Sequence, residues 1–245
     1  MLLAIDIGNT SVAFGLFEGG TLRQNGHFET KRARDLEELE ASLPDSKGVD
    51  AVAISNVVPA LTQNFFEASR NLYNQKPLWV NVETAKIPLR VDDPREVGAD
   101  RLCNAVAAWE KFKRAAIIVD FGTATTLDIV TAKGEYGGGA ICPGLEMAGK
   151  NLAEGTAQLP KVKIEKPKRV VGRNTVECIQ AGLYHGYIGM IDHLVRLSIK
   201  EEGCPMKVVA TGGLADLLAK ESKTIEAVEP FLTLEGVCYI WKRNL

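Results

Sequence analysis

The sequence predicts an α/β protein made of two duplicated domains, each built around its own sheet. The chain has 245 residues, which suits two domains of roughly 100 to 150 residues each. Hydrophobic residues make up 46% of the chain and charged residues 24%, a balance that lets each half bury a core. The succession of strands, turns and helices also begins again near residue 114. We therefore expect one domain over residues 1–113 and a second over residues 114–245.

The first half alternates strands with helices. Apolar runs bounded by turn residues predict strands, and apolar residues three or four positions apart predict helices. The expected strands are Leu2–Ile7, Ser11–Phe17, Thr21–Thr30, Ala51–Ser55 and Leu78–Asn81. The expected helices are Asp35–Leu43, Pro59–Tyr73 and Gly98–Phe112. Residues 88–97 are polar and contain Pro94, so we expect a loop there.

The second half repeats this order. The expected strands are Ala115–Asp120, Thr126–Thr131, a third that begins at Gly137–Ile141, and Lys207–Ala210. The expected helices are Pro143–Ala153, a long one over Thr175–Lys200, and Gly213–Lys220. The repetition predicts that the two halves share one topology.

Charge and composition argue against several kinds of partner. Net charge is −2, from 29 Lys and Arg against 31 Asp and Glu, with no basic cluster of the kind that nucleic acid or an anionic membrane attracts. The five cysteines form no Cys-x-x-Cys pair, so neither a zinc site nor a disulfide framework is expected. The apolar start is too short for a signal peptide, and no run of about 18 apolar residues exists elsewhere. We expect a cytoplasmic protein without a nucleic-acid or membrane partner.

Two short segments share one form. Ala4–Thr10 is Ala-Ile-Asp-Ile-Gly-Asn-Thr, and Ile118–Ala124 is Ile-Val-Asp-Phe-Gly-Thr-Ala. Glycine lets a backbone approach phosphate closely, while backbone N–H and hydroxyl groups donate to its oxygens. The Asp6 carboxylate would be repelled by phosphate, so it would act by holding a hydrated Mg²⁺. One Asp-x-Gly alone is more often a simple hairpin turn, but two copies at strand ends favour phosphate binding.

A third feature supports nucleotide binding. Val208–Gly213 is Val-Val-Ala-Thr-Gly-Gly, a strand that runs into two glycines and then a helix. Two glycines before a helix leave room for a flat adenine or ribose. The alternative is an ordinary strand–turn–helix connection, and the two preceding loops favour the first interpretation.

Four motifs together resemble those of the type III pantothenate kinases, in order over nearly the whole chain. The motifs are Asp6-Ile7-Gly8-Asn9-Thr10, Gly98-Ala99-Asp100-Arg101, Asp120-Phe121-Gly122-Thr123-Ala124-Thr125-Thr126 and Thr211-Gly212-Gly213. These kinases belong to the superfamily of acetate and sugar kinases, heat-shock chaperone ATPases and actin. The resemblance implies two ribonuclease H-like domains of the actin-like ATPase fold, with the active site in the cleft between them. It also implies a homodimer that transfers the γ-phosphate of ATP to the primary hydroxyl of pantothenate, the first step of coenzyme A synthesis.

The resemblance further implies a role for each matching residue. The ATP phosphate loop would comprise Asp6, Ile7, Gly8, Asn9, Thr10, Ser11, Val12 and Ala13, with Thr123 as another ATP contact. Pantothenate would be bound by Gly98, Ala99, Asp100, Arg101 and Thr175, with Asp100 as the catalytic base. Asp120 would hold a monovalent cation, K⁺ or NH₄⁺.

Asp100 has two interpretations. A free Asp has a pKa of about 3.9, which makes it a weak base for an alcohol. In a loose phosphoryl transfer, however, the hydroxyl loses its proton late, so orienting that hydroxyl matters as well. Arg101 beside it suits a substrate carboxylate or the transferring phosphate. The alternative is that Asp100 caps a helix beginning near Arg101; the resemblance favours the catalytic role.

Two further positions qualify the substrate site. Asn174 followed by Glu177 resembles a capping box, so Thr175 could simply begin a helix. The family often has Tyr near pantothenate in a segment like Arg-Tyr-Asp-Asn-Pro, whereas this chain has Val91 in Arg90–Pro94. A Val side chain cannot donate a hydrogen bond, which puts that substrate contact in doubt but leaves the phosphate loops unaffected.

Two other functions compete with this one. A sugar or acetate kinase of the same superfamily would carry a different substrate loop in place of Gly98–Arg101. A non-catalytic regulator of transcription would be expected to lack Asp100 or Asp120, and both are present. The sequence also shows no helix-turn-helix with a basic recognition face.

Overall fold

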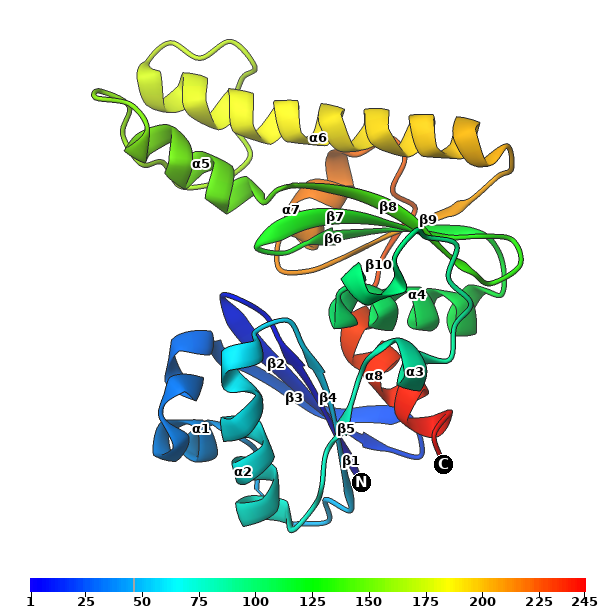
Figure 1. Cartoon of the computed structure of the whole chain (residues 1–245). Coiled ribbons are helices and arrows are strands. Elements are labelled where there is room, and N and C mark those ends of the chain that lie inside the picture. The colour runs from blue at the N-terminus through cyan, green and yellow to red at the C-terminus, as the bar shows by residue number, and fades with distance from the viewer. Residues whose placement is uncertain (46) are drawn as a thin grey trace. The chain divides into compact units, whose positions relative to one another are not determined.

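A computed structural model describes residues 1–45 and 47–245 of the chain (Figure 1). Contacts between residues divide the chain into two compact units. The first unit comprises Met1–Lys113, Gly134–Tyr136 and Phe231–Leu245, and the second comprises Arg114–Lys133 and Gly137–Pro230. Two segments that follow residue 113, Gly134–Tyr136 and Phe231–Leu245, thus pack with the first unit.

The first unit is built on a five-stranded sheet in the order β3-β2-β1-β4-β5. The strands are β1 (Leu2–Ile7), β2 (Ser11–Glu18), β3 (Thr21–Glu29), β4 (Ala51–Asn56) and β5 (Leu78–Trp79). The central strand β1 pairs antiparallel with β2 and parallel with β4. The carboxyl ends of β1 and β4 consequently lie side by side at one edge of the sheet.

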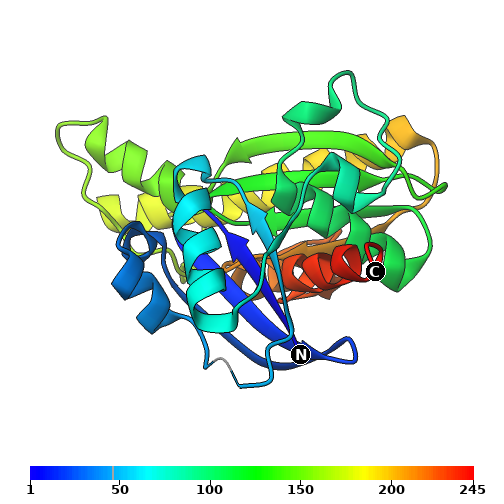
Figure 2. The ribbon, with the colours of Figure 1, turned by 60° about the horizontal axis from the view of Figure 1, so that its bottom comes forward.

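Helices cover both faces of this first sheet (Figures 1 and 2). The helical segments of the unit are η1 (Thr30–Arg34), α1 (Leu36–Ser42), η2 (Pro59–Leu61), α2 (Thr62–Tyr73), α3 (Val82–Ala85), η3 (Pro94–Glu96), α4 (Ala99–Phe112) and α8 (Leu232–Lys242). Helices α1 and α2 lie on one face, and α4 and α8 pack on the other.

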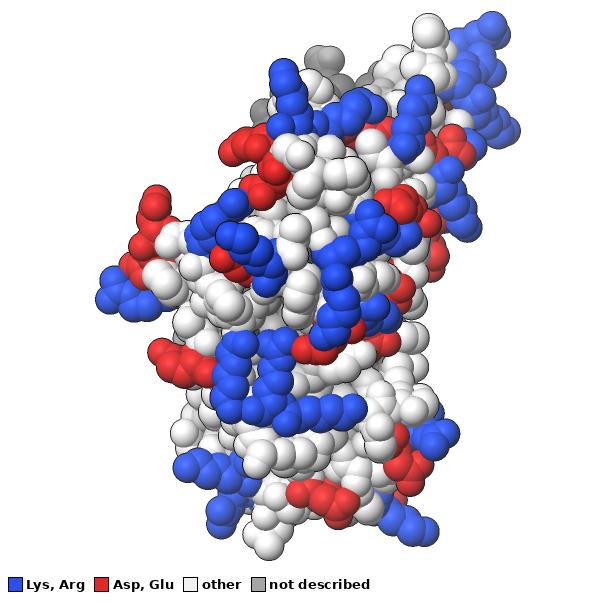
Figure 3. All heavy atoms as spheres, turned by 90° about the vertical axis from the view of Figure 1, so that its right-hand side faces the viewer, with Lys and Arg blue, Asp and Glu red and all other residues white. Residues whose placement is uncertain are grey.

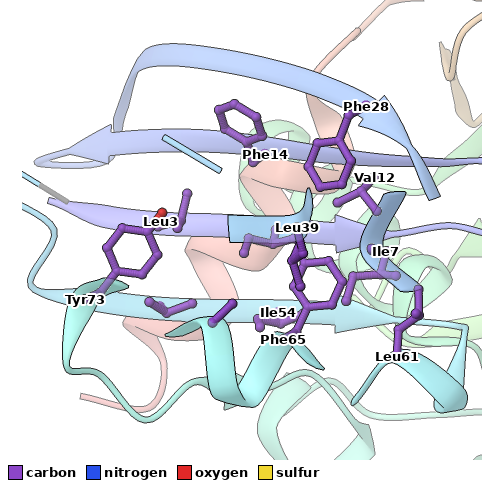
Figure 4. Packing of buried hydrophobic residues seen from close by; sticks show 14 of the residues in the cluster. Leu3, Ile7, Val12, Phe14, Phe28, Leu39, Ile54, Leu61, Phe65 and Tyr73 are labelled. Atoms are coloured by element: carbon purple, nitrogen blue, oxygen red, sulfur yellow. The ribbon is translucent and has the colours of Figure 1, made fainter. Parts of the chain in front are cut away.

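Strand periodicity separates the two faces of β1. Leu3, Ile5 and Ile7 belong to a buried cluster with Leu39 of α1 and Phe65 of α2. Figure 4 shows four of these residues, Leu3, Ile7, Leu39 and Phe65. Because successive side chains on a strand alternate in direction, Asp6 points to the opposite face, where α4 and α8 pack. The alternation thus places the Asp6 carboxylate away from the apolar core formed with α1 and α2.

The second unit is built on a sheet of the corresponding order, β8-β7-β6-β9-β10. Its strands are β6 (Ala116–Phe121), β7 (Ala124–Val130), β8 (Tyr136–Pro143), β9 (Lys207–Thr211) and β10 (Ala227–Val228). Its helical segments are α5 (Leu145–Glu154), α6 (Thr175–Glu202), α7 (Ala215–Leu218) and η4 (Ala219–Glu221). Helix α6 buries Tyr184, Tyr187 and Ile191 in the core that contains Ile117 and Val119 of β6.

The two sheets have the same topology. In each, the first strand of the unit is central, pairs antiparallel with the next strand and pairs parallel with the fourth. This confirms the prediction of an α/β fold with two duplicated domains, because the equivalence extends to strand order and direction as well as to local sequence.

Several local details differ from the sequence expectation, among them the 3₁₀ turn η3 in the segment expected as loop and the short strand β10, which was not predicted. Strand β5 ends at Trp79 because the Asn81 side chain accepts from Thr84 N–H and begins the short helix α3. Helix α8 and helix α3 were not predicted. The segment expected as helix over Gly213–Lys220 divides into α7 and the 3₁₀ turn η4. In the described ranges 1–45 and 47–245, no helix combines the length and apolarity needed to cross a bilayer.

Candidate functional site

The first Asp-x-Gly segment forms an exposed hairpin turn between β1 and β2. Ile7 pairs with Val12, so the turn consists of residues 8–11, closed by a 3.0 Å hydrogen bond from Gly8 N–H to the Ser11 carbonyl. Thr30 fixes the turn from outside: its hydroxyl donates to the Gly8 carbonyl at 2.7 Å, and its N–H donates to the Thr10 carbonyl at 3.0 Å. The turn is therefore exposed yet held in one geometry.

The strand ends beside this turn carry polar side chains. Asp6 lies opposite Ser55 in the parallel pairing of β1 with β4 and opposite Ala13 in the pairing with β2. The Ser55 side chain is fully buried. Sequence reasoning did not select Ser55, because only the register of β1 against β4 brings it beside Asp6.

The Gly98–Arg101 motif forms the start of α4. Gly98 occupies the N-cap position, and its side-chain-free Cα lies close to Asp100: a Cβ there would come within 2.6 Å of Asp100 Oδ1. Asp100 is the second helical residue, and its Oδ1 accepts from Arg101 N–H at 2.7 Å. The expectation that Asp100 is the N-cap is wrong, since the helix begins at Ala99, but its carboxylate does bind a backbone N–H of the first turn.

Burial changes the acidity of Asp100. Burial raises the pKa of the Asp100 carboxyl above its ordinary value, against the opposing effects of the Arg101 N–H and the Arg101 charge. A raised pKa makes a carboxylate a stronger base than a solvated Asp. The positive end of the helix favours the ionised carboxylate, so it acts against the effect of burial on the Asp100 pKa.

The buried Cys103 thiol is influenced by the charges of both Asp6 and Asp100. Cys103 lies one turn beyond Asp100 on α4 and is fully buried. Burial, followed by the charges of Asp6 and Asp100, raises the pKa of this thiol well above its ordinary value. The charges of both carboxylates therefore act on the same buried thiol. Because Asp6 faces the side of the first sheet that α4 and α8 cover, the first motif and the Gly98–Arg101 motif lie on one side of that sheet. No local sequence signal identified Cys103.

Arg101 has an aromatic support. Its guanidinium lies over the Tyr136 ring at 5.7 Å from the ring centroid. Tyr136 is fully buried, and its backbone pairs with the segment before α4: its N–H donates to the Pro88 carbonyl, and its carbonyl accepts from Arg90 N–H, both at 2.8 Å. Tyr136 comes from the second half of the sequence, so no local pattern around Arg101 predicts this contact.

The second Asp-x-Gly segment forms a shorter turn between β6 and β7. Phe121 pairs with Thr125, and Gly122 N–H donates to the Ala124 carbonyl at 3.1 Å. The turn consists of residues 122–124 and is one residue shorter than its counterpart. Gly122 and Thr123 are exposed, so the two turns are related in topology but differ in shape.

Asp120 and the Thr211–Gly213 motif are neighbours. Asp120 pairs with Thr211 in the parallel register of β6 with β9. Gly212 has φ of 88°, and a Cβ there would lie 2.5 Å from Asp120 Oδ1 and 2.7 Å from the Phe121 carbonyl oxygen. A side chain at position 212 would be strained and would displace the carboxylate. The Asp120 carboxylate oxygen and the Phe121 carbonyl oxygen therefore both lie close to Gly212.

The Thr123 turn also packs against the start of α5. A Cβ on Gly144 would lie 2.0 Å from the Thr123 carbonyl oxygen and 2.7 Å from the Gly122 carbonyl oxygen. Just before it, the Pro143 carbonyl and the Thr125 hydroxyl both lie at hydrogen-bond distance from the buried Tyr187 hydroxyl of α6. The close packing at Gly144 and the hydrogen bonds of the Tyr187 hydroxyl hold this turn in place.

Thr175 is the first residue of α6 and is exposed. Asn174 caps the helix by accepting from Glu177 N–H at 2.9 Å, while the Glu177 carboxylate accepts from Arg173 N–H at 2.9 Å. The capping interpretation of this segment is therefore confirmed for Asn174, with the return bond one residue earlier than in a capping box. Thr175 itself lies beside an apolar groove that Leu152, Ile179 and Leu183 also line.

The segment that contains Val91 lies next to Tyr136. Leu89 forms an isolated bridge with Tyr136, and Arg90 N–H donates to the Tyr136 carbonyl. Val91 is only partly exposed. An aromatic ring is thus present within the first unit close to this segment, although it comes from position 136 rather than 91.

The oxygen atoms that lie beside each of the two turns suit a different kind of ion. Asp6 and Ser55 supply oxygen at the end of β1 and β4, which is the donor type that Mg²⁺ takes, often through water. Asp120 and the Phe121 carbonyl supply a carboxylate and a backbone oxygen around Gly212, a combination that suits a hard monovalent cation.

On the face drawn in Figure 3, basic and acidic side chains are interspersed over most of the surface.

Comparison with known proteins agrees with this geometry. The family model described as type III pantothenate kinase matches residues 2–197. The type III pantothenate kinase of Myxococcus xanthus (strain DK1622) is 46% identical over 254 residues, which cover 100% of this chain and 99% of the relative. Among solved structures, a conserved Campylobacter jejuni protein assigned to the Baf family of transcriptional activators aligns with a TM-score of 0.60 and 18% identity over 99% of this chain and 98% of that one.

Another solved structure extends the fold comparison. A Listeria monocytogenes protein assigned as an N-acetylmannosamine kinase aligns with a TM-score of 0.54 and 16% identity over 100% of this chain and 99% of that one. Such low identities establish the fold alone. The paired sheets and their glycine turns therefore define a protein of the sugar-kinase and actin-like ATPase fold class. Within that class, the chain belongs to the type III pantothenate kinase family.

Proposed function

We propose that this chain transfers the γ-phosphoryl group of ATP to the primary hydroxyl of pantothenate, giving 4′-phosphopantothenate in the first step of coenzyme A synthesis. The observation that carries the proposal is the position of Asp100 in the first turn of α4, half-buried, with a raised pKa, and near the same buried thiol as Asp6. Family membership supplies the substrate class.

Phosphoryl transfer asks the protein mainly to position groups and to stabilise charge. In this proposal the turn within Asp6–Ala13 binds the ATP phosphates, and Asp6 holds Mg²⁺ through water. Asp100 accepts a hydrogen bond from the pantothenate hydroxyl, orients it and takes its proton as the bond to phosphorus forms. Arg101, supported by the Tyr136 ring, binds the substrate carboxylate or the transferring phosphoryl group.

The second unit supplies the remaining groups of the proposal. Asp120 holds K⁺ or NH₄⁺, with the oxygens gathered beside Gly212 as support. Thr123 contacts ATP from its exposed turn, and Thr175 contacts pantothenate from the start of α6. The five cysteines are free thiols, in keeping with a reaction in the reducing cytoplasm.

We also propose that the active form is a homodimer. Helix α6 exposes Val176 and Leu197, and α5 exposes Met147 and Leu152. On α6, Gly182, Gly186 and Gly189 are exposed and have no other atoms near the Cβ position, so a second helix could approach closely. Size-exclusion chromatography with light scattering tests this, and a mass equal to one chain at micromolar concentration would exclude it.

A coupled assay of ADP release tests the catalytic proposal. Pantothenate, acetate and a panel of sugars are supplied separately, each in K⁺ and in Na⁺ buffers. We expect turnover with pantothenate alone, and substantially more in K⁺ than in Na⁺. Turnover with a sugar or acetate but not pantothenate would contradict the proposed substrate, whereas equal rates in both buffers would contradict only the cation role of Asp120.

A further inference from the structure

A cavity of about 340 Å³ lies beside the first phosphate turn, within the first unit. It is lined by the turn, by η1 and by the N-terminal part of α2. The lining residues that matter here are Asn9, Thr30, Arg34, Ala60, Leu61 and Asn64. Of these, only Asn9 was assigned a role, so most of this cavity is unaccounted for by the proposed function.

Hydrogen bonds fix the walls of this cavity. Thr30, at the start of η1, binds the Gly8 and Thr10 carbonyls of the turn. Asn64 of α2 donates from its side-chain amide to the Ala33 and Arg34 carbonyls at 2.9 and 3.2 Å. Segment η1 is thereby joined both to the turn and to α2, which places the Arg34 backbone in a defined position.

The cavity has a positive character. Among the described residues that line it, Arg34 alone is charged. Its neighbours Lys31 and Arg32 form ion pairs with Glu29 and Glu38, whereas no ion pair found in the described ranges 1–45 and 47–245 includes Arg34. Asn64 of the first turn of α2 and Leu61 at the end of η2, just before that helix, belong to the wall, and the positive end of a helix favours a negative ligand there.

We propose that this cavity is a phosphate subsite in which the Arg34 guanidinium binds a terminal phosphoryl group together with Asn9. The shared wall residue Asn9 makes the cavity continuous with the phosphate turn, so one polyphosphate chain reaches both. A guanidinium presents paired N–H donors that match phosphate oxygens. The identification of the bound molecule as ATP rests on the proposed function, but phosphate binding by the cavity does not.

Titration calorimetry of the full chain with inorganic tripolyphosphate tests the subsite without any turnover. Replacing Arg34 by Gln should weaken tripolyphosphate binding about tenfold, the effect expected from loss of a charge-assisted hydrogen bond to phosphate. Ala60→Glu, which adds a carboxylate to an exposed wall position, should also weaken it. Arg32→Gln is the matched control, since it removes a neighbouring charge of the same segment that does not line the cavity, and it should change binding less than twofold.

The outcomes separate this inference from the proposed function. Unchanged tripolyphosphate affinity in Arg34→Gln, or an equal loss in Arg32→Gln, would overturn the subsite. A higher KM for pantothenate with unchanged tripolyphosphate affinity would also overturn it, because the cavity would then bind a carboxylate. If pantothenate is not a substrate at all but Arg34→Gln still loses tripolyphosphate, the subsite stands and only the proposed function fails.

Discussion

At the scale of single residues, Asp100 shows how the position proposed for the catalytic base opposes stability. Burial raises its pKa, so its ionised form costs folding free energy at any pH above the ordinary value of about 3.9. We expect Asp100→Asn to lower kcat by about 10²-fold or more, the range of general base catalysis, with a melting temperature equal to or above that of the parent. Activity of the parent should fall as pH decreases toward the raised pKa, and the steady-state pH profile measures this limb.

The exposed Glu96 of the preceding loop is the matched control for Asp100. Glu96→Gln should retain both kcat and the acidic limb of the pH profile. A kcat in Asp100→Asn within a few-fold of the parent would remove Asp100 from the proton transfer. A marked loss of melting temperature in that variant would instead indicate that the carboxylate acts mainly by holding the first turn of α4.

At the scale of elements, one carboxylate of α6, that of Asp192, binds the segment Ser222–Thr224 that follows α7. Asp192 is buried and accepts from the Ser222 and Thr224 hydroxyls at 2.6 and 2.7 Å and from Lys223 N–H at 3.0 Å. Burial alone would raise the Asp192 pKa, but these bonds outweigh it and lower the pKa. The stabilisation is therefore present above the ordinary Asp pKa and is lost as pH falls through the lowered value. Asp192→Asn should cost about 1–3 kcal/mol at pH 7, and less near pH 3, because part of the stabilisation is lost below the ordinary Asp pKa.

Urea unfolding at both pH values measures the Asp192 effect, with the exposed Glu201→Gln on the same helix as control. Because both proteins carry the same other carboxylates, the difference between variant and parent isolates this group. A difference that is equally large at pH 3 would show that packing, not charge, carries the interaction.

The elements also show what a sequence can predict. The strand Leu2–Ile7 and the start of α6 at Thr175 follow from local patterns, and both are confirmed. The neighbourhood of Asp6, Asp100 and Cys103 does not follow, because it depends on how α4 and α8 pack against each other and against the first sheet. Helix α8 was missed altogether; it is apolar on most sides, so the polar face that marks an amphipathic helix is weak.

At the scale of the whole molecule, the chain returns to its first unit twice, briefly at Gly134–Tyr136 and again in its last segment, Phe231–Leu245. Helix α8 packs against α4 so closely that a Cβ on Gly236 would lie 2.1 Å from the Cys103 carbonyl oxygen. Side-chain bonds follow the same interface, including Thr233 to Asn104 at 2.8 Å and Lys111 to Glu235 at 2.6 Å. The first unit therefore cannot complete its core before the whole of the second has been synthesised, which is why a division at residue 113 does not describe its contacts.

Replacing Gly236 by Ala tests the closeness of this packing. Helix propensity alone favours Ala by up to about 1 kcal/mol, but the added methyl meets backbone atoms of α4, so we expect a net loss of about 1–3 kcal/mol. All three tryptophans of the chain, Trp79, Trp109 and Trp241, belong to the first unit. Tryptophan fluorescence should therefore report the lower unfolding midpoint, while Lys242→Ala at an exposed position of the same helix should leave it unchanged. A gain in stability for Gly236→Ala would mean that α4 and α8 separate more easily than their contact implies.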